Sequence, residues 1–210
     1  MAHHDANHGT HEREYWNERY SASAQLWSGA PNSIVVEVAS TLAPGSALDV
    51  GCGEGADAVW LALQAWDVTA LDVSDVALSR AEVHARDAGV SVHWLLAGLL
   101  DAQLAPASFD LVSAQYPVLS KTPDAVAEHV LLDAVAVGGT LVFVHHADFQ
   151  SNDHAHGDFN PADYVGPWDV LPLLGADWQV ETNETRPRSV ATGAGAGHSA
   201  DVILVAKRVG

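Results

Sequence analysis

The sequence predicts an α/β fold with a mostly parallel sheet, helices on both faces, and two antiparallel strands at the C-terminal end. Three observations carry this prediction. Short apolar runs alternate with helix-forming stretches, a glycine-rich turn follows the first run, and no helical pattern separates the last two runs. The expected strands cover residues 46–50, 67–72, 91–95, 109–114, 140–145, 177–184 and 201–208.

Helical stretches fill the intervals between the early strands, at residues 55–65, 75–88 and 122–136. Ser74 precedes the second stretch and has the character of an N-cap residue. Successive strands that are joined through helices of this length run parallel to one another.

Two further helices are expected ahead of the first strand, at residues 12–26 and 32–42, the second of which ends at Pro44-Gly45. Near the other end of the chain, Asn160 and Pro161 predict the start of a helix that runs to Leu174. The glycine-containing segment before residue 201 has no helical pattern, so the last two strands should pair antiparallel.

Composition limits the kind of protein. The chain has 210 residues, of which 48% are apolar, enough for one domain with a sizeable core. Its formal charge of −18 disfavours nucleic-acid binding, which depends on clustered Lys and Arg. Cys52 is the single cysteine, which excludes an intramolecular disulfide. Because no apolar run could span a bilayer, we expect a cytoplasmic protein with no membrane partner. We also expect a monomer or a homodimer.

A glycine loop follows the first strand, in the run Ala47-Leu-Asp-Val-Gly-Cys-Gly-Glu-Gly55. Such a loop ahead of a helix brings backbone close to a nucleotide-like ligand. Asp72 ends the next strand, where a carboxylate can hydrogen-bond ribose hydroxyls. A dinucleotide loop reads Gly-x-Gly-x-x-Gly and tolerates Ala56 at its last position, so the glycines alone leave the ligand open.

Four blocks in order resemble the motifs of class I S-adenosylmethionine-dependent methyltransferases. They are Asp49-Val-Gly-Cys-Gly-Glu-Gly55, Ala70-Leu-Asp-Val-Ser74, Ser108-Phe-Asp-Leu-Val112 and Gly138-Gly-Thr-Leu-Val142. The resemblance covers nearly the whole chain. It implies a Rossmann-like, seven-stranded, mostly parallel sheet with an antiparallel C-terminal strand hairpin, and S-adenosyl-L-methionine as cofactor.

The resemblance also assigns the cofactor-binding residues. Gly51 and Gly53, with Cys52 between them, would let the backbone approach the methionine part, where a Cβ would collide. Asp49 would favour the cationic end, and Gln115 would face the methyl group or the methionine end. The ribose would meet Asp72, which Val73 follows. Many relatives place an acidic residue against the adenine where this chain has Leu99. Apolar contact there and backbone hydrogen bonds at Leu100 would have to suffice, or Asp101 would substitute if the loop is shifted.

The N-terminal segment resembles a bacterial branch of small methyltransferases whose relatives include the tellurite-resistance and thiopurine S-methyltransferases. The similar runs are Glu14-Tyr-Trp-Asn-Glu-Arg-Tyr20 and Trp27-Ser-Gly-Ala-Pro-Asn32. In that branch the N-terminal helix folds over the cofactor, and a tryptophan near the turn touches it. Trp27 is the candidate for that contact here, or else it is an ordinary buried tryptophan that anchors the helix. We therefore divide a single domain, 1–210, into a flexible histidine-rich tail over 1–12, a helical lid over 13–43 and the remainder.

The acceptor side is expected at His145 and His146, which end the fifth strand. Either imidazole could take a proton from an acceptor hydroxyl or thiol, or serve as a hydrogen-bonded structural group. His198 could reach the same place from the other side. The run Asp153-His-Ala-His-Gly-Asp158 has a metal-like composition, but methyl transfer from a sulfonium needs no metal and none is expected.

These residues predict an enzyme that transfers a methyl group to a small molecule, a thiol, chalcogenide or hydroxyl compound, by in-line displacement. Gln115-Tyr-Pro117 lacks the Asn-Pro-Pro-Tyr arrangement of nucleic-acid and protein-glutamine N-methyltransferases, so those acceptors are not expected. Two alternatives stay open: a non-catalytic S-adenosylmethionine-binding module and a nicotinamide-dependent oxidoreductase.

Overall fold

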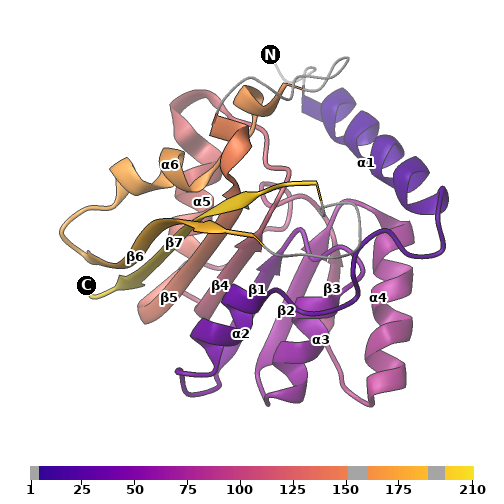
Figure 1. Cartoon of the computed structure of the whole chain (residues 1–210), viewed down its shortest axis with the longest axis horizontal. Helices are drawn as coiled ribbons and strands as arrows, with labels where there is room; N and C mark the ends of the chain where they lie inside the picture. The colour runs from indigo at the N-terminus through magenta and orange to yellow at the C-terminus, as the bar shows by residue number, and fades with distance from the viewer. Residues whose placement is uncertain (1–4, 151–159, 189–196) are drawn as a thin grey trace.

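The sheet has seven strands in the order β3-β2-β1-β4-β5-β7-β6. A computed structural model describes residues 5–150, 160–188 and 197–210 (Figure 1). Strands β1 to β5 pair parallel, and β7 pairs antiparallel with both β5 and β6. The predicted α/β fold with a C-terminal hairpin is confirmed. The strands are β1 (Ser46–Val50), β2 (Asp67–Asp72), β3 (His93–Leu96), β4 (Phe109–Gln115), β5 (Val135–His146), β6 (Trp178–Pro187) and β7 (Ala200–Arg208).

The helices agree with the sequence prediction except near their ends and in one late segment. The helix α1 begins at Asp5, within the segment that the sequence suggested as a tail, and Ser74 caps α4 by accepting a hydrogen bond from the Ala77 amide. The α-helices are α1 (Asp5–Ser21), α2 (Ser33–Ala39), α3 (Ala56–Leu63), α4 (Asp75–Ala88), α5 (Val126–Ala134) and α6 (Pro167–Val170). The short 3₁₀ turns are η1 (Pro123–Ala125), η2 (Ala147–Gln150), η4 (Pro161–Asp163) and η5 (Leu171–Leu173).

The single helix expected from Pro161 to Leu174 is wrong. Asn160 does cap the first turn, but that turn ends after Asp163, and α6 and η5 follow as separate short pieces. Pro167 and Pro172 explain the breaks, because proline lacks an amide hydrogen and clashes with the preceding helical turn. Each proline instead occupies an early position of a new turn, where its amide would be unsatisfied anyway.

Two apolar clusters cover the two faces of the sheet. One joins residues of α2 and α3, such as Val35 and Leu61, to strand residues such as Val144. The other joins Leu131 of α5 and Val170 of α6 to Phe143. Val144 and Phe143 are neighbours on β5 that point to opposite faces, as the alternation of a strand requires. Burial on both faces explains why β4 and β5 read as nearly continuous apolar runs.

The carboxyl ends of β1, β2 and β4 meet where the strand order reverses, between β1 and β4. Asp49 of β1 lies beside Ala70 of β2 and Ser113 of β4 in the register. Figure 1 shows α1 beyond these strand ends, beside the top of α4. Ligands of open α/β sheets bind at such a switch point. Within the described ranges, no helix combines the length and apolar character that crossing a membrane requires.

Candidate active site

The glycine loop after β1 is held by its own backbone and by Asp72. The amides of Gly51 and Cys52 both donate to the Leu71 carbonyl at 2.9 Å, which ties the loop to the end of β2. Gly53 has a φ of +54°, and its amide donates to Asp72 Oδ2 at 2.9 Å. A Cβ at Gly53 would lie 2.9 Å from Tyr20 Oη and 3.2 Å from Trp27 Nε1. Both its backbone conformation and the close approach of Tyr20 therefore require glycine at this position.

Asp72 lies where the sequence placed the ribose-binding carboxylate. Its second oxygen accepts from the Ser74 amide at 2.8 Å, and the side chain is buried. Burial raises the pKa of Asp72, and the hydrogen bonds from the Ser74 and Gly53 amides oppose that effect. Because a carboxylate offers about four acceptor positions, these two bonds leave room for hydroxyl donors.

Asp49 and Gln115 carry buried oxygens that lack a partner among the described residues, namely Asp49 Oδ2 and Gln115 Oε1. Only 2% of Asp49 is exposed. Its pKa is raised well above the ordinary value by burial and by the neighbouring charges of Asp57 and Asp72. An unpaired buried acceptor is costly, and a cation or an amine donor at this position would satisfy it. The residues at the strand ends thus fit the amino end of S-adenosylmethionine.

We expect cofactor binding to release a proton from Asp49. A cation beside the carboxylate favours its ionised form and lowers its pKa. At a pH between the free and bound pKa values, S-adenosylhomocysteine, which retains the amino group, should displace that proton, and affinity should rise with pH. Titration calorimetry in buffers of different ionisation enthalpy measures the proton count. The same release from an Asp49→Asn variant would contradict the assignment.

The N-terminal segment is fastened to the glycine loop through Glu54. Its carboxylate accepts from the amides of Leu26 and Trp27 at 3.0 to 3.2 Å, and it pairs with Arg80 of α4 at 2.8 Å. Arg80 also donates to the carbonyls of Tyr20 and Ser23. Bonds between ionised groups and backbone are among the stronger ones in proteins. The segment after α1 is therefore fixed beside the glycine loop.

Further polar contacts hold α1 and the segment after it. Asn17 accepts from Ser74 Oγ and donates to Asp75, each at 2.6 Å, and Arg13 donates to the Val73 carbonyl at 3.1 Å. Asp57 on α3 accepts from the amide and the side chain of Asn32 at 2.6 and 2.7 Å. We call residues 13–32 the roof segment, because these contacts hold it over the strand ends.

Substitution of Gly53 by alanine is expected to loosen the roof segment. The new Cβ would meet Tyr20 Oη, whose hydrogen bond with Trp27 Nε1 measures 2.9 Å. Gly89→Ala is the matched control, since its φ of +72° is similarly strained but nothing lies within 4 Å of its Cβ. Both variants should lose about 1 kcal/mol from the backbone conformation.

Only Gly53→Ala should also speed protease cleavage within residues 13–32. Limited proteolysis with mass spectrometry checks this result. Equal cleavage of the two variants would mean that the contact with Tyr20 does not hold the segment.

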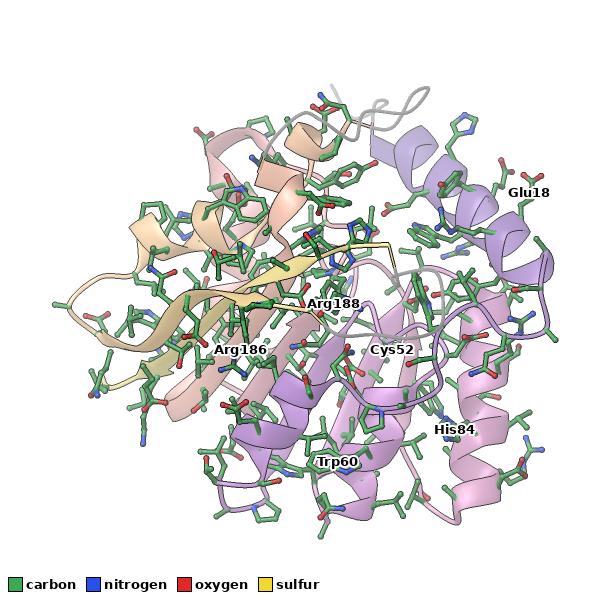
Figure 2. The ribbon with its side chains drawn as sticks, viewed as in Figure 1. Glu18, Cys52, Trp60, His84, Arg186 and Arg188 are labelled. Carbon is green, nitrogen blue, oxygen red and sulfur yellow. The ribbon has the colours of Figure 1, made fainter. Side chains whose placement is uncertain are left out.

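The remaining residues that the resemblance assigned to the cofactor differ in their burial and contacts. Val73 follows Asp72, and its carbonyl is used by Arg13. Leu99 is 3% exposed within the core cluster that includes α5, whereas Leu100 is 48% exposed. Leu99 is thus a core residue in this structure, which leaves Leu100 as the one with an accessible side chain. Cys52 packs partly against the cluster of α2 and α3, and burial raises the pKa of its thiol (Figure 2).

At the end of β5, His146 belongs to a hydrogen-bonded cluster. Its Nδ1 lies 3.1 Å from Oδ1 of Asp201, the residue opposite it on β7. Tyr116 donates to the other Asp201 oxygen at 2.8 Å, and Arg188 pairs with that oxygen at 3.0 Å. Burial lowers the pKa of His146 despite the bond to Asp201, and the nearby Arg188 charge acts in the same direction. His146 is therefore a neutral, oriented imidazole near neutral pH.

His145 points to the other face of the sheet, among Phe149 and Trp168. Its Nδ1 accepts from the His146 amide at 2.9 Å, and its ring also bonds the Pro117 carbonyl. Burial, aided by the proximity of His146, lowers the pKa of His145 to about 3. Of the two candidate histidines, His146 pairs with a carboxylate, whereas His145 contacts backbone groups.

His198, which the sequence suggested could reach the acceptor pocket, lies beside His146. Its ring stacks on His146 with centroids 3.6 Å apart, and its Nδ1 lies 2.7 Å from Asp148 Oδ2. The run 153–158 lies outside the described residues. Among the described ones, no group of three or more His, Cys, Asp or Glu side chains is arranged to hold a metal.

Sequence reasoning missed Tyr116, Arg188 and Asp201 as site residues. Tyr116 has a φ of +53°, rare for a side chain of this size, and its amide bonds the Val144 carbonyl. Arg188 follows the last residue of β6 (Figure 2), and its Cζ lies 4.5 Å from the centroid of the Tyr116 ring. No local pattern marks these residues, because their partners lie far away along the chain.

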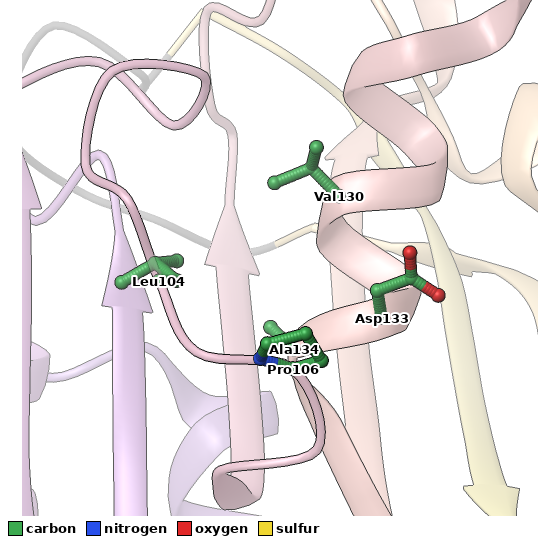
Figure 3. Close-up of a pocket in the computed structure, with 5 residues that line it drawn as sticks. All are labelled: Leu104, Pro106, Val130, Asp133 and Ala134. Carbon is green, nitrogen blue, oxygen red and sulfur yellow. The ribbon is translucent and has the colours of Figure 1, made fainter.

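A separate cavity of about 160 Å³ lies between the segment before β4 and α5 (Figure 3). Leu104, Pro106, Val130, Asp133 and Ala134 line it. It sits beside the amino end of β4, since the amides of residues 107 and 108 bond the carbonyls of Asp133 and Ala134. The glycine loop lies at the carboxyl ends of the strands, so this cavity is not part of the candidate site.

Residues 47–138 match a family described as a methyltransferase domain. An uncharacterized methyltransferase of Mycobacterium tuberculosis is 37% identical over 97 residues, which make up 46% of this chain and 48% of that relative. The matched region thus spans about half the length of the curated relative.

Solved structures show the same fold. A protein from work on the conversion of a disulfide bond into a thioacetal group during echinomycin biosynthesis has a TM-score of 0.72 and 21% identity, over 95% of this chain and 90% of that one. The N-methyltransferase NodS from Bradyrhizobium japonicum WM9, in complex with S-adenosyl-L-homocysteine, has a TM-score of 0.63 and 20% identity, over 84% of each chain. The domain match thus covers less than half of the chain, and the solved structures share its fold.

Proposed function

We propose that the protein methylates a small molecule at a thiol, chalcogenide or aromatic hydroxyl group, with His146 as the proton acceptor. The observation that carries the proposal is the pairing of His146 with Asp201 at 3.1 Å, at the same edge of the sheet as the glycine loop. Asp201 orients the ring through Nδ1, which leaves Nε2 to take a proton. Burial opposes the ionisation of Asp201, but bonds from His146 and Tyr116 and the charge of Arg188 outweigh it and lower its pKa.

The cofactor-facing residues have distinct tasks in this proposal. Asp72 would hold the ribose, Asp49 and Gln115 would hold the amino end, and the loop around Gly53 would admit the methionine part. When bound, S-adenosylmethionine supplies a methyl group on a sulfonium, whose sulfur keeps the electron pair of the broken bond and becomes a neutral thioether. The roof segment would exclude water and fix the direction of attack, which are the main catalytic needs of such a transfer.

The basicity of His146 favours acidic acceptors. The ordinary pKa of a protonated imidazole is about 6.5, that of a thiol about 8.5 and that of a phenol about 10. The pKa of an alkyl alcohol is close to that of water, about 16. Since one pKa unit corresponds to about 1.4 kcal/mol, removing the proton costs roughly 3, 5 and 13 kcal/mol respectively. A turnover of about ten per second allows a total barrier of only about 16 kcal/mol, so the alkyl alcohol leaves little for the transfer itself.

The charge of the chain supports a small acceptor. With 27 acidic and nine basic residues, the surface repels the phosphates of nucleic acids. The roof segment narrows access to the strand ends, because its polar contacts bind it to α3, α4 and the glycine loop. A macromolecular acceptor would have to displace those contacts.

The experiment combines binding and turnover. Calorimetry should show S-adenosylhomocysteine binding and no binding of oxidised nicotinamide dinucleotide. A panel of thiols, phenols and alkyl alcohols, followed by mass spectrometry for the gain of a methyl group, should give product with the first two classes only. Binding without any turnover would support a non-catalytic binding module instead, and binding of the dinucleotide alone would refute the cofactor.

A further inference from the structure

Arg188 has a hydrogen-bonding edge that the described part of the protein does not use. The residue follows β6, its amide donates to the Ser199 carbonyl at 2.8 Å, and 9% of its side chain is exposed. Its Nη1 donates to both oxygens of Asp201, at 3.0 and 3.3 Å, and to the Tyr116 hydroxyl. Its Nε is buried and has no hydrogen-bond partner among the described residues.

The unpartnered Nε of Arg188 has the properties of a ligand-binding donor. A buried donor without a partner is costly, above all in a charged group, so each such case calls for an explanation. The guanidinium is planar and carries its five N–H donors in a fixed fork. Because Asp201 and Tyr116 hold Nη1, the direction of the Nε–H bond is fixed before any ligand arrives. An oxygen supplied by a ligand would satisfy this donor.

The unused edge lies at the acceptor end of the site. Asp201 Oδ1, which Arg188 contacts, is also the oxygen that lies 3.1 Å from His146 Nδ1. The Tyr116 ring lies against both residues, since its centroid is 4.3 Å from that of the His146 ring and 4.5 Å from Arg188 Cζ. An acceptor whose reacting group meets His146 would therefore have another part of its structure beside Arg188.

The local charge favours a neutral oxygen over an anion as the partner of Arg188. Asp201 lies 3.0 Å from the guanidinium, so the positive charge is already balanced. A carboxylate brought to the same guanidinium would stand close to Asp201, and like charges repel strongly in a buried site. The formal charge of −18 on the whole chain acts in the same direction. A carbonyl oxygen accepts a hydrogen bond from Nε without adding a charge.

We infer that the methyl acceptor carries a carbonyl oxygen near its reacting hydroxyl or thiol, and that Arg188 binds this oxygen through Nε. The inference rests on the proposed function, because it places the reacting group at His146. Arg188 then determines specificity: it selects among acceptors and takes no part in breaking or forming a covalent bond. An acceptor without the carbonyl would leave the donor buried and unpartnered, a mismatch that binding sites reject strongly.

The test compares matched pairs of phenols that bind to the full chain in the presence of S-adenosylhomocysteine. The ortho, meta and para hydroxyacetophenones carry a carbonyl, and the corresponding isopropylphenols have a methyl group in place of its oxygen. Titration calorimetry should show that at least one ketone binds about 10- to 100-fold more tightly than its partner. Arg188→Lys keeps a positive charge beside Asp201 but lacks the Nε–H donor, so that ratio should fall by about tenfold or more.

Arg186→Lys is the matched control. Arg186 stands two residues earlier on β6, its side chain is 40% exposed, and it pairs with Glu37 and Glu184. Its substitution should leave the affinity ratio unchanged. The acidity of the phenol differs within each pair but is the same for every variant, so the change between variants reports the loss of the Arg188 donor.

An NMR measurement observes the same bond directly. The ¹⁵N–¹H signal of Arg188 Nε is assigned by its loss in Arg188→Lys. In the wild type, its proton should move downfield when the preferred ketone binds, as a new hydrogen bond requires. If Arg188→Lys fails to fold, Arg188→Gln replaces it in both measurements.

Equal affinities within every pair, failure of all the ketones to bind, or an unchanged ratio in the Arg188 variants would overturn the inference. Tighter binding of a hydroxybenzoate than of the matching hydroxyacetophenone would also overturn it, because the recognised group would then be an anion. None of these measurements needs methyl transfer. Preferred binding of the ketones without turnover would contradict the proposed methylation and leave the carbonyl-binding role of Arg188 in place.

Discussion

Replacing His146 with asparagine is expected to slow methyl transfer by about 10²- to 10⁴-fold for a phenolic acceptor. Asparagine places an amide nitrogen near the position of Nδ1 and can still donate to Asp201, but it cannot take a proton. The affinity for S-adenosylhomocysteine should not change, since His146 lies at the acceptor end. Single-turnover rates and calorimetry measure the two quantities separately. A thiol acceptor, which loses its proton more readily, should be affected less.

The pH dependence supplies the second part of this prediction. In the wild type, the rate should fall as the pH falls through the pKa of His146, which lies below its ordinary value of about 6.5. The His146→Asn variant should not show this fall in rate at low pH. His129→Asn, on the exposed side of α5, is the control that removes an imidazole elsewhere. Equal rates for wild type and His146→Asn across the pH range would mark His146 as a structural residue.

Replacing Asp72 is expected to weaken cofactor binding by about 100-fold or more. A hydrogen bond to a charged group contributes about 1.5 to 3 kcal/mol, and the ribose would supply two of them. Asp72→Asn should have a further effect within the protein. The amides of Gly53 and Ser74 each donate to one oxygen of Asp72. The NH₂ group of asparagine would replace one of these oxygens, so that two donors would face each other.

Calorimetry with S-adenosylhomocysteine measures the loss, and circular dichroism verifies the fold. Asp67→Asn is the matched control, since this exposed aspartate begins the same strand at its opposite end and has 79% of its side chain accessible. Unchanged affinity in Asp72→Asn would refute the assignment of this carboxylate to the ribose.

The sequence predicted the parts of the site that depend on neighbouring residues. A strand, a glycine turn and a helix lie within one short stretch, so Asp49, Gly53 and their surroundings could be read directly. Asp72 ends the adjacent strand, and its position follows from parallel pairing alone. These elements are determined by alternation of apolar residues and by the backbone conformation that glycine permits.

The rest depends on contacts between distant segments. Glu54 and Arg80 hold the roof segment through partners that lie about 30 to 60 positions away along the chain. In the sequence alone, these two charged residues cannot be distinguished from charged residues of a loop or helix that face solvent. Arg188 and Asp201 become site residues only because the antiparallel hairpin brings them to the end of β5. The prolines that divide the helix after Pro161 were visible in the sequence and should have shortened that prediction.

The carboxylate of Glu54 belongs to the cofactor loop, yet every partner it has among the described residues lies on the roof segment or α4. In the proposed site, two equilibria are thereby linked: occupancy by the cofactor, and ordering of the chain that covers it. Thermodynamic reciprocity requires each to stabilise the other by the same free energy. A chain shortened at its beginning would consequently bind its nucleoside less tightly, although no atom of the crevice itself had been removed.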